Sequence, residues 1–146
     1  MIDYYKCQYH FNASHSFDGN KEQAHSHTFT MILYISNLSG RDMDFKRLDR
    51  MIEIFLGRYE GLYLNELSCF AGNASIEAIG DYFYEQLKIK LSELNAELMQ
   101  LDIGDTPLGV YQVCDRILLP TVNERRSREN LEAILFYKKQ MLDQKK

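Results

Sequence analysis

The chain has 146 residues, the length of one domain with a full hydrophobic core, and 45% of its residues are apolar. Its formal net charge of −4 argues against the strongly basic character of a nucleic-acid-binding protein. The cysteines Cys7, Cys69 and Cys114 are odd in number and far apart, so the sequence predicts neither a disulfide framework nor a zinc ribbon.

The N-terminal segment MIDYYKCQYHF lacks the pattern of a secretory signal peptide, and no apolar run approaches the length of a membrane span. Unpaired cysteines are typical of a reducing compartment. We therefore expect a cytoplasmic protein that binds neither membrane nor nucleic acid.

Two long strands are predicted at the start of the chain. Residues 2–17 alternate with a period of two, and residues 18–24 form a polar, glycine-containing loop. The alternation returns at His25 and continues through an apolar run with many β-favouring residues. A pair of antiparallel strands joined by the loop follows from this pattern.

Two helices are predicted next. Asp44 is a plausible N-cap, and Gly57 ends a helix whose apolar positions recur at helical spacing, namely Phe45, Leu48, Ile52 and Phe55. Asn73 or Ser75 is the expected N-cap of a second helix. Its apolar stripe consists of Ile79, Phe83, Leu87 and Leu91.

Two further strands and a terminal helix complete the predicted order. Met99, Leu101 and Ile103 alternate, the segment GDTPLG turns the chain, and residues 110–119 form the last strand. The stretch from residue 123 onward is helical in composition.

The resulting order, ββααββ plus a C-terminal helix, predicts an α+β fold with a four-stranded antiparallel sheet and two helices on one face. Residues 1–120 would form the main domain and residues 121–146 its helical extension. Because such a sheet has open edges, we expect a homo-oligomer.

The segment AHSHTF places two of the four histidines one residue apart, at the start of the second strand. Positions i and i+2 of a strand project from the same face, so His25 and His27 can converge on one ion. A hairpin brings His15 beside them. Three neutral imidazoles leave a fourth position open, as in catalytic zinc sites. An HxH pair also occurs by chance, and the placement of surface imidazoles without a metal remains an alternative.

Several segments, in this order, resemble motifs of the 6-pyruvoyl-tetrahydropterin synthase family: FNASHSF, AHSHTF, GRDMDFKRL, YLNEL, NASIEAIGDYFYEQL and GDTPLGVY. The resemblance covers about residues 5–112. That family includes the 6-carboxy-tetrahydropterin synthases of queuosine biosynthesis. The resemblance implies a T-fold that assembles into trimers or hexamers, and a zinc ion held by His15, His25 and His27.

The resemblance also identifies a catalytic candidate. Members of the family usually carry, shortly before the histidine pair, a cysteine that acts as the proton-abstracting base. The corresponding loop here reads GNKEQA and has no cysteine. A variant branch, which resembles a source of folate precursors, has glutamate instead in the pattern ExxHGH. Glu22 stands at that spacing before His25, and by this match it would be the general base.

Three positions are implied to bind the substrate. Asp105 replaces the glutamate that anchors the pterin ring, and a carboxylate can accept two hydrogen bonds from the amino-pyrimidine edge. Glu60 lies in YEGLYLN, where the family has an Asp–His pair, and Ser75 occupies another motif position with altered chemistry.

The sequence therefore predicts a zinc-dependent lyase of this type, acting on dihydroneopterin triphosphate or a related pterin. Either triphosphate elimination or cleavage of the side chain would follow. The alternative is a family member that binds zinc and pterin without catalysis, because the usual cysteine and the relay histidine are absent.

Overall fold

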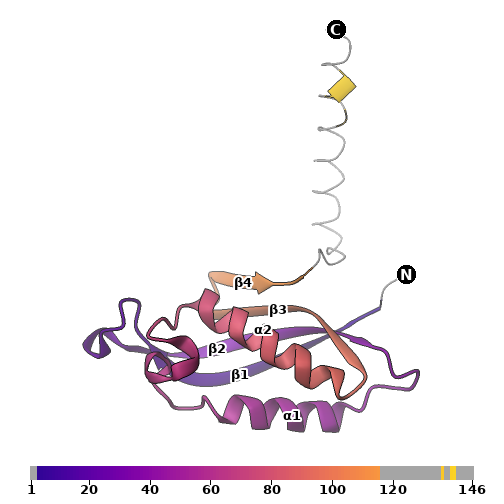
Figure 1. Cartoon of the computed structure of the whole chain (residues 1–146), viewed down its shortest axis with the longest axis horizontal. Coiled ribbons are helices and arrows are strands. Elements are labelled where there is room, and N and C mark those ends of the chain that lie inside the picture. Colours follow the sequence, from indigo (N-terminus) through magenta and orange to yellow (C-terminus); the bar gives the residue numbers. More distant parts are fainter. Residues whose placement is uncertain (1–2, 116–135, 137–138, 141–146) are drawn as a thin grey trace. The chain divides into compact units, whose positions relative to one another are not determined.

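The computed structural model describes residues 3–115, 136, 139 and 140 of the chain (Figure 1). The chain divides into two units, residues 1–116 and 117–146, and the fold described below is that of the first. Residues 136, 139 and 140 are helical. The rest of the predicted C-terminal helix, the end of the predicted last strand and the proposed domain boundary at residue 120 lie outside the described residues.

Four strands form one antiparallel sheet in the order β1-β2-β3-β4 (Figure 1). The strands are β1 (Tyr5–His15), β2 (His25–Asn37), β3 (Ala96–Thr106) and β4 (Gly109–Val113). Two helices, α1 (Phe45–Gly57) and α2 (Ile76–Ser92), follow β2 in the chain. The predicted order ββααββ is confirmed.

The pairing of β1 with β2 is continuous from Tyr5↔Ile35 to His15↔His25. Its alternation decides which side chains enter the core, because successive residues of a strand point to opposite faces. The buried members include Phe11 of β1 and Phe29, Met31, Leu33 and Ile35 of β2. The rings of Phe11 and Phe29 stack with centroids 4.9 Å apart.

The prediction that Met99 shares a face with Leu101 and Ile103 is wrong. Tyr34 pairs with Gln100 and the next residue, Ile35, pairs with Leu98, so Met99 is an extra residue in β3. Such a bulge reverses the alternation. Leu98 joins the core cluster, whereas Met99 lies outside that cluster although it is also buried.

Helix α1 begins where the sequence predicts. The Asp44 carboxylate accepts a hydrogen bond from the backbone N–H of Arg47. Leu48, Ile52 and Phe55 are buried as expected, whereas Phe45 is 44% exposed and rests edge-on against the ring of Tyr5. Phe45 therefore borders the core rather than filling it.

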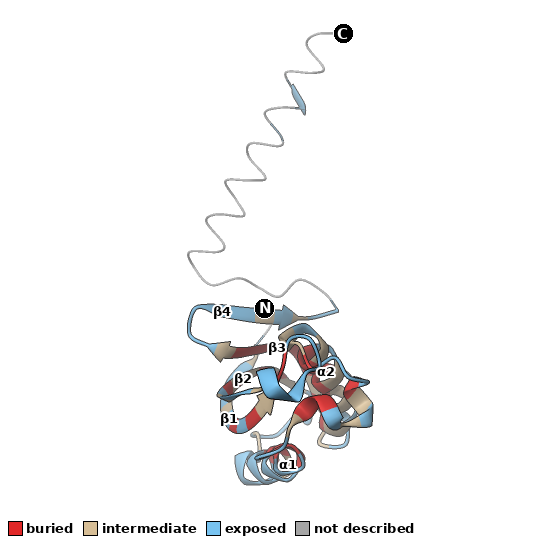
Figure 2. Ribbon diagram, turned by 90° about the vertical axis from the view of Figure 1, so that its left-hand side faces the viewer, coloured by how far each residue is buried: buried red, intermediate tan, exposed pale blue. Residues whose placement is uncertain are grey.

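Helix α2 is capped by Ser75, whose hydroxyl accepts a hydrogen bond from the N–H of Ala78. All four residues of the predicted stripe are buried, namely Ile79, Phe83, Leu87 and Leu91. They join the buried face of α1 and the inward residues of the sheet in one core cluster, so both helices cover the same face (Figure 2).

The segment after α1 runs along the end of β1. The N–H of Gly61 donates to the carbonyl of Asn12 over 2.7 Å, and the N–H of Ser14 donates to the carbonyl of Leu62 over 2.9 Å. A parallel bridge joins Ser14 to Tyr63. This stretch of the β1 edge therefore has its backbone groups satisfied within the chain.

Phe83 lies at the centre of the aromatic core, in ring contact with Phe11, Phe55 and Tyr59. We expect Phe83→Ala to lower the free energy of unfolding by about 3–5 kcal/mol, because it leaves a cavity that the surrounding rings fill only in part. Urea denaturation followed by circular dichroism measures this. Ile89→Ala, at a position of the same helix that is 62% exposed, should change stability by no more than about 0.5 kcal/mol. Equal losses in the two variants would contradict this description of the core.

Candidate metal centre

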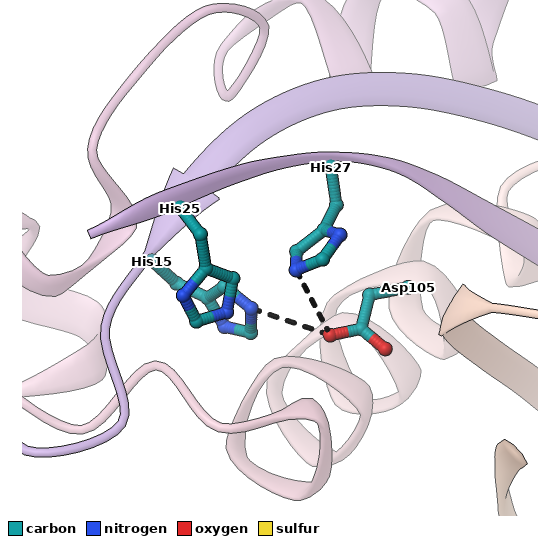
Figure 3. Close-up of side chains that lie close together, drawn as sticks. All are labelled: His15, His25, His27 and Asp105. Carbon is teal, nitrogen blue, oxygen red and sulfur yellow. Dashed lines mark ion pairs between the residues drawn. The ribbon is translucent and has the colours of Figure 1, made fainter. Parts of the chain in front are cut away.

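Three histidines gather where the β1–β2 hairpin ends (Figure 3). His15 is the last residue of β1 and His25 the first of β2, and they are partners in the sheet register. His27 pairs with Ala13 and shares the inward parity. The His15 ring is 4.6 Å from the His25 ring and 5.4 Å from the His27 ring, centroid to centroid.

A carboxylate completes this group from another strand (Figure 3). Asp105 lies near the end of β3, and its Oδ2 is 3.3 Å from Nε2 of His15 and 3.6 Å from Nε2 of His27. Each of the four residues offers a ligand atom within 4.8 Å of the others. Among the described residues, these four side chains form the one cluster whose nitrogen and oxygen atoms could bind a metal ion together.

Gly104 allows the approach of β4 just before Asp105. A Cβ at Gly104 would stand 2.8 Å from the carbonyl oxygen of Gly109, closer than real Cβ atoms come. The β3–β4 pairing is also irregular between Ile103 and Thr106. Asp105 therefore lies where the regular pairing of the β3–β4 hairpin is interrupted.

His15 is held in one orientation by the segment before α2. Its Nδ1 lies 2.7 Å from the carbonyl oxygen of Ala74, and because a carbonyl only accepts, Nδ1 is the donor. In the neutral ring Nε2 then carries a lone pair. That atom is buried, has no hydrogen-bond partner among the described residues, and faces the other three side chains. Histidines that bind a metal usually donate their other ring N–H to a backbone carbonyl, a carboxylate or a water molecule.

Burial lowers the pKa of His27 below its ordinary value, with smaller contributions in the same direction from His25 and His15. The carboxylate of Asp105 acts in the opposite sense. A lowered pKa favours the neutral imidazole at neutral pH. Because only the neutral ring has a lone pair to give, this electrostatic environment suits metal binding.

The chain that follows His15 is fixed by Asn65, a residue to which the sequence analysis gave no role. The Asn65 side chain accepts from the N–H of Ser16 over 2.9 Å and donates to the carbonyls of Ser16 and Gly72 over 3.1 and 2.9 Å. The only signal in the sequence is an amide within YLNEL, between the apolar Leu64 and Leu67. Its partner Ser16 lies 49 residues away in the sequence.

Glu22 lies in a short 3-10 turn (Lys21–Gln23) and is exposed. Its backbone N–H donates to Oδ1 of Asn20. Glu22 lies in the loop that leads into His25, but it is not one of the four clustered residues.

The other two predicted substrate-binding residues have structural partners. The Glu60 carboxylate accepts from the backbone N–H and the side-chain amide of Asn12, both over 2.9 Å, and these bonds lower the pKa of Glu60. The Ser75 hydroxyl caps α2. The structure thus brings together His15, His25, His27 and Asp105, while Glu60 and Ser75 are engaged elsewhere.

Comparison with known proteins agrees with this fold. The sequence model of the family described as 6-pyruvoyl tetrahydropterin synthase matches residues 4–115. Among solved structures, 6-pyruvoyl tetrahydropterin synthase of Caenorhabditis elegans is 18% identical with a TM-score of 0.67, and the match covers 80% of this chain and 97% of that one. An uncharacterized protein from Wolinella succinogenes is 12% identical with a TM-score of 0.62, covering 80% and 99%. Comparison with curated protein sequences gave no match.

The fold is an α+β T-fold, which the chain shares with the Caenorhabditis elegans structure. More specifically, the chain belongs to the 6-pyruvoyl tetrahydropterin synthase family, because the family match spans most of its length. The resemblance noted from the motifs is thereby confirmed. A search of the helices of the described residues found none with the length and apolarity of a membrane span.

We expect Asn65→Ala to lower the free energy of unfolding by about 1–3 kcal/mol, because buried backbone groups of Ser16 and Gly72 lose their partner. The variant should also bind metal less tightly, since His15 precedes Ser16. Urea denaturation and chelator competition measure the two effects. Asn73→Ala, at an exposed position, is the matched control. Unchanged stability in Asn65→Ala would show that the amide does not hold this segment.

Proposed function

We propose that this protein is a zinc-dependent enzyme that acts on dihydroneopterin triphosphate or a related pterin, by triphosphate elimination or by cleavage of the side chain. The observation that carries the proposal is the convergence of three imidazoles and a carboxylate at one end of a T-fold. Family membership supports a pterin as the ligand.

The donor set fits zinc. Imidazole nitrogen and carboxylate oxygen are both common zinc ligands, and zinc accepts four of them in a tetrahedral arrangement. Nε2 of His15 is buried and accepts no hydrogen bond from the described residues, so its lone pair is available to the metal. When bound, zinc would polarise the side-chain oxygens of the pterin and acidify the adjacent C–H bond.

The remaining roles belong to residues of the chain. Glu22 would move the proton as general base, and Asp105 would orient the ring by accepting hydrogen bonds from its amino-pyrimidine edge. Because Glu22 is exposed, this role requires its loop to bring the carboxylate to the substrate. Glu60 and Ser75 remain predicted substrate-binding residues.

A hollow of about 330 Å³ adjoins Asp105 on the other side of the sheet. It has the volume of a small-ligand site, at the lower end of the usual range. It is lined by residues that include Thr28, Thr30, Gly104 and Val110. A larger polar hollow of about 560 Å³ lies among the residues 37–47 and 93–95, which contribute none of the four metal-binding candidates.

A second candidate function is a protein that binds zinc and pterin without catalysis. It is favoured by the loop GNKEQA, which lacks the cysteine, and by YEGLYLN, which lacks the relay histidine. For either function we propose a cytoplasmic homo-oligomer, a trimer or hexamer. The strands β1 and β4 support assembly because they stand at the two edges of the described sheet.

Metal analysis tests the centre directly. The purified protein should carry about one zinc per chain, and His27→Ala should lose it because the variant lacks one of the three imidazoles. His10→Ala is the matched control, since His10 has the opposite parity on β1 and its Nδ1 lies 3.1 Å from the hydroxyl of Thr30. A folded wild-type protein that takes up no zinc, or equal loss in both variants, would remove the zinc premise.

Catalysis is tested by incubating the zinc-loaded protein with dihydroneopterin triphosphate and separating the pterins. We expect product, formed about 10²–10⁴-fold more slowly by Glu22→Gln, which keeps the shape of the side chain but loses its basicity. Asp18→Asn removes a carboxylate from the same loop and should leave the rate unchanged. Binding of the pterin without any product would favour the second function. Equal rates in wild type and Glu22→Gln would show that another group is the base.

A further inference from the structure

The contact between Asp105 and His15 places two acceptors face to face. The bond from Nδ1 of His15 to the Ala74 carbonyl leaves a lone pair on Nε2 of the neutral ring. The carboxylate oxygen 3.3 Å away also offers lone pairs. Such an arrangement is repulsive unless a cation lies between the two atoms.

A metal ion bound by both atoms would satisfy both lone pairs. Nε2 of His15 makes no hydrogen bond among the described residues, so the atom is available as a ligand. The carboxylate oxygen stands beside both His15 and His27, at 3.3 and 3.6 Å. One carboxylate oxygen within 3.6 Å of two imidazole nitrogens is the pattern of ligands around a common centre.

The spacing agrees with tetrahedral coordination. Zinc–ligand bonds of about 2.0–2.1 Å separate neighbouring ligand atoms by roughly 3.3–3.4 Å, the edge of the tetrahedron. The two distances from Asp105 are close to this edge, and all four ligand atoms lie within 4.8 Å of one another. Three imidazoles with a carboxylate make a closed set, whereas a catalytic zinc keeps one position for water or substrate.

We propose that Asp105 is the fourth metal ligand of the substrate-free protein, and that an incoming oxygen ligand must displace it to reach the metal. This inference rests on the proposed metal centre. It differs from the role implied by the family resemblance, in which the carboxylate at this position binds the ring from the start. Once displaced, the carboxylate would be free to accept the ring's hydrogen bonds.

The position of Asp105 in the sheet suits such an exchange. The pairing of β2 with β3 ends at Thr30↔Gly104, and that of β3 with β4 passes from Ile103 to Thr106. Asp105 therefore has no partner in either ladder, so its backbone can shift together with its side chain without breaking a ladder pair. Its side chain is 17% exposed, so that it borders solvent as well as the histidines.

Cobalt substitution tests the proposal without an activity assay. Co²⁺ is loaded into wild type, Asp105→Ala and Asp105→Asn, and its visible absorption is followed while azide is added. We expect azide to bind wild type at least about tenfold more weakly than Asp105→Ala, because the carboxylate occupies the position that azide needs. The Zn²⁺ affinity of Asp105→Ala, measured by chelator competition, should fall at least about tenfold, the loss that even an indirect partner of a ligand causes.

Asp18→Asn controls for the general effect of removing a carboxylate near the centre and should match wild type in both measurements. Circular dichroism establishes that each variant folds, and Asp105→Asn replaces Asp105→Ala if the smaller side chain impairs folding. Equal azide and Zn²⁺ affinities in wild type and the folded Asp105 variant would overturn the inference while leaving the three-histidine centre intact. Failure of wild type to bind either metal would overturn both this inference and the proposed function.

Discussion

The register of the β1–β2 hairpin is the constraint on which the core and the candidate centre both depend. It aligns Phe11 with Phe29 and, four residues further along β1, His15 with His25. Because the side-chain period of a strand is two, a slip by one residue would turn the apolar residues and the histidines away from the helices together. The burial of the core therefore also specifies the placement of the imidazoles in the candidate centre.

Local patterns were enough to predict most of this framework. Period-two alternation identified β1 and β2, and N-cap chemistry located the start of α1 at Asp44 and that of α2 at Asn73 or Ser75, of which Ser75 is the cap. The bulge at Met99 was missed because an extra residue in one strand is defined by its pairing with another strand. Leu98 and Met99 are both apolar, and nothing in the sequence indicates which of them joins the core cluster.

Some contacts of the candidate site can likewise be predicted from local sequence patterns, and others join segments that are distant in the sequence. The histidines could be predicted to meet because a hairpin fixes their separation. The clamp formed by Asn65 and the bond from His15 to Ala74 join segments about 50 to 60 residues apart, so that no local pattern contains them. The nearness of Asp105 to His15 likewise depends on how β3 packs against β2, which the sequence does not display.

The segment that follows α1 has a consequence for how copies of this chain can meet. By satisfying the backbone of Asn12 and Ser14, it closes the end of the β1 edge nearest the histidines to any added strand. A neighbouring strand can pair only along the part of β1 that precedes Asn12. If copies of this chain assemble by adding a strand to β1, that strand pairs with the end of β1 remote from His15 and not with the end beside the candidate metal centre.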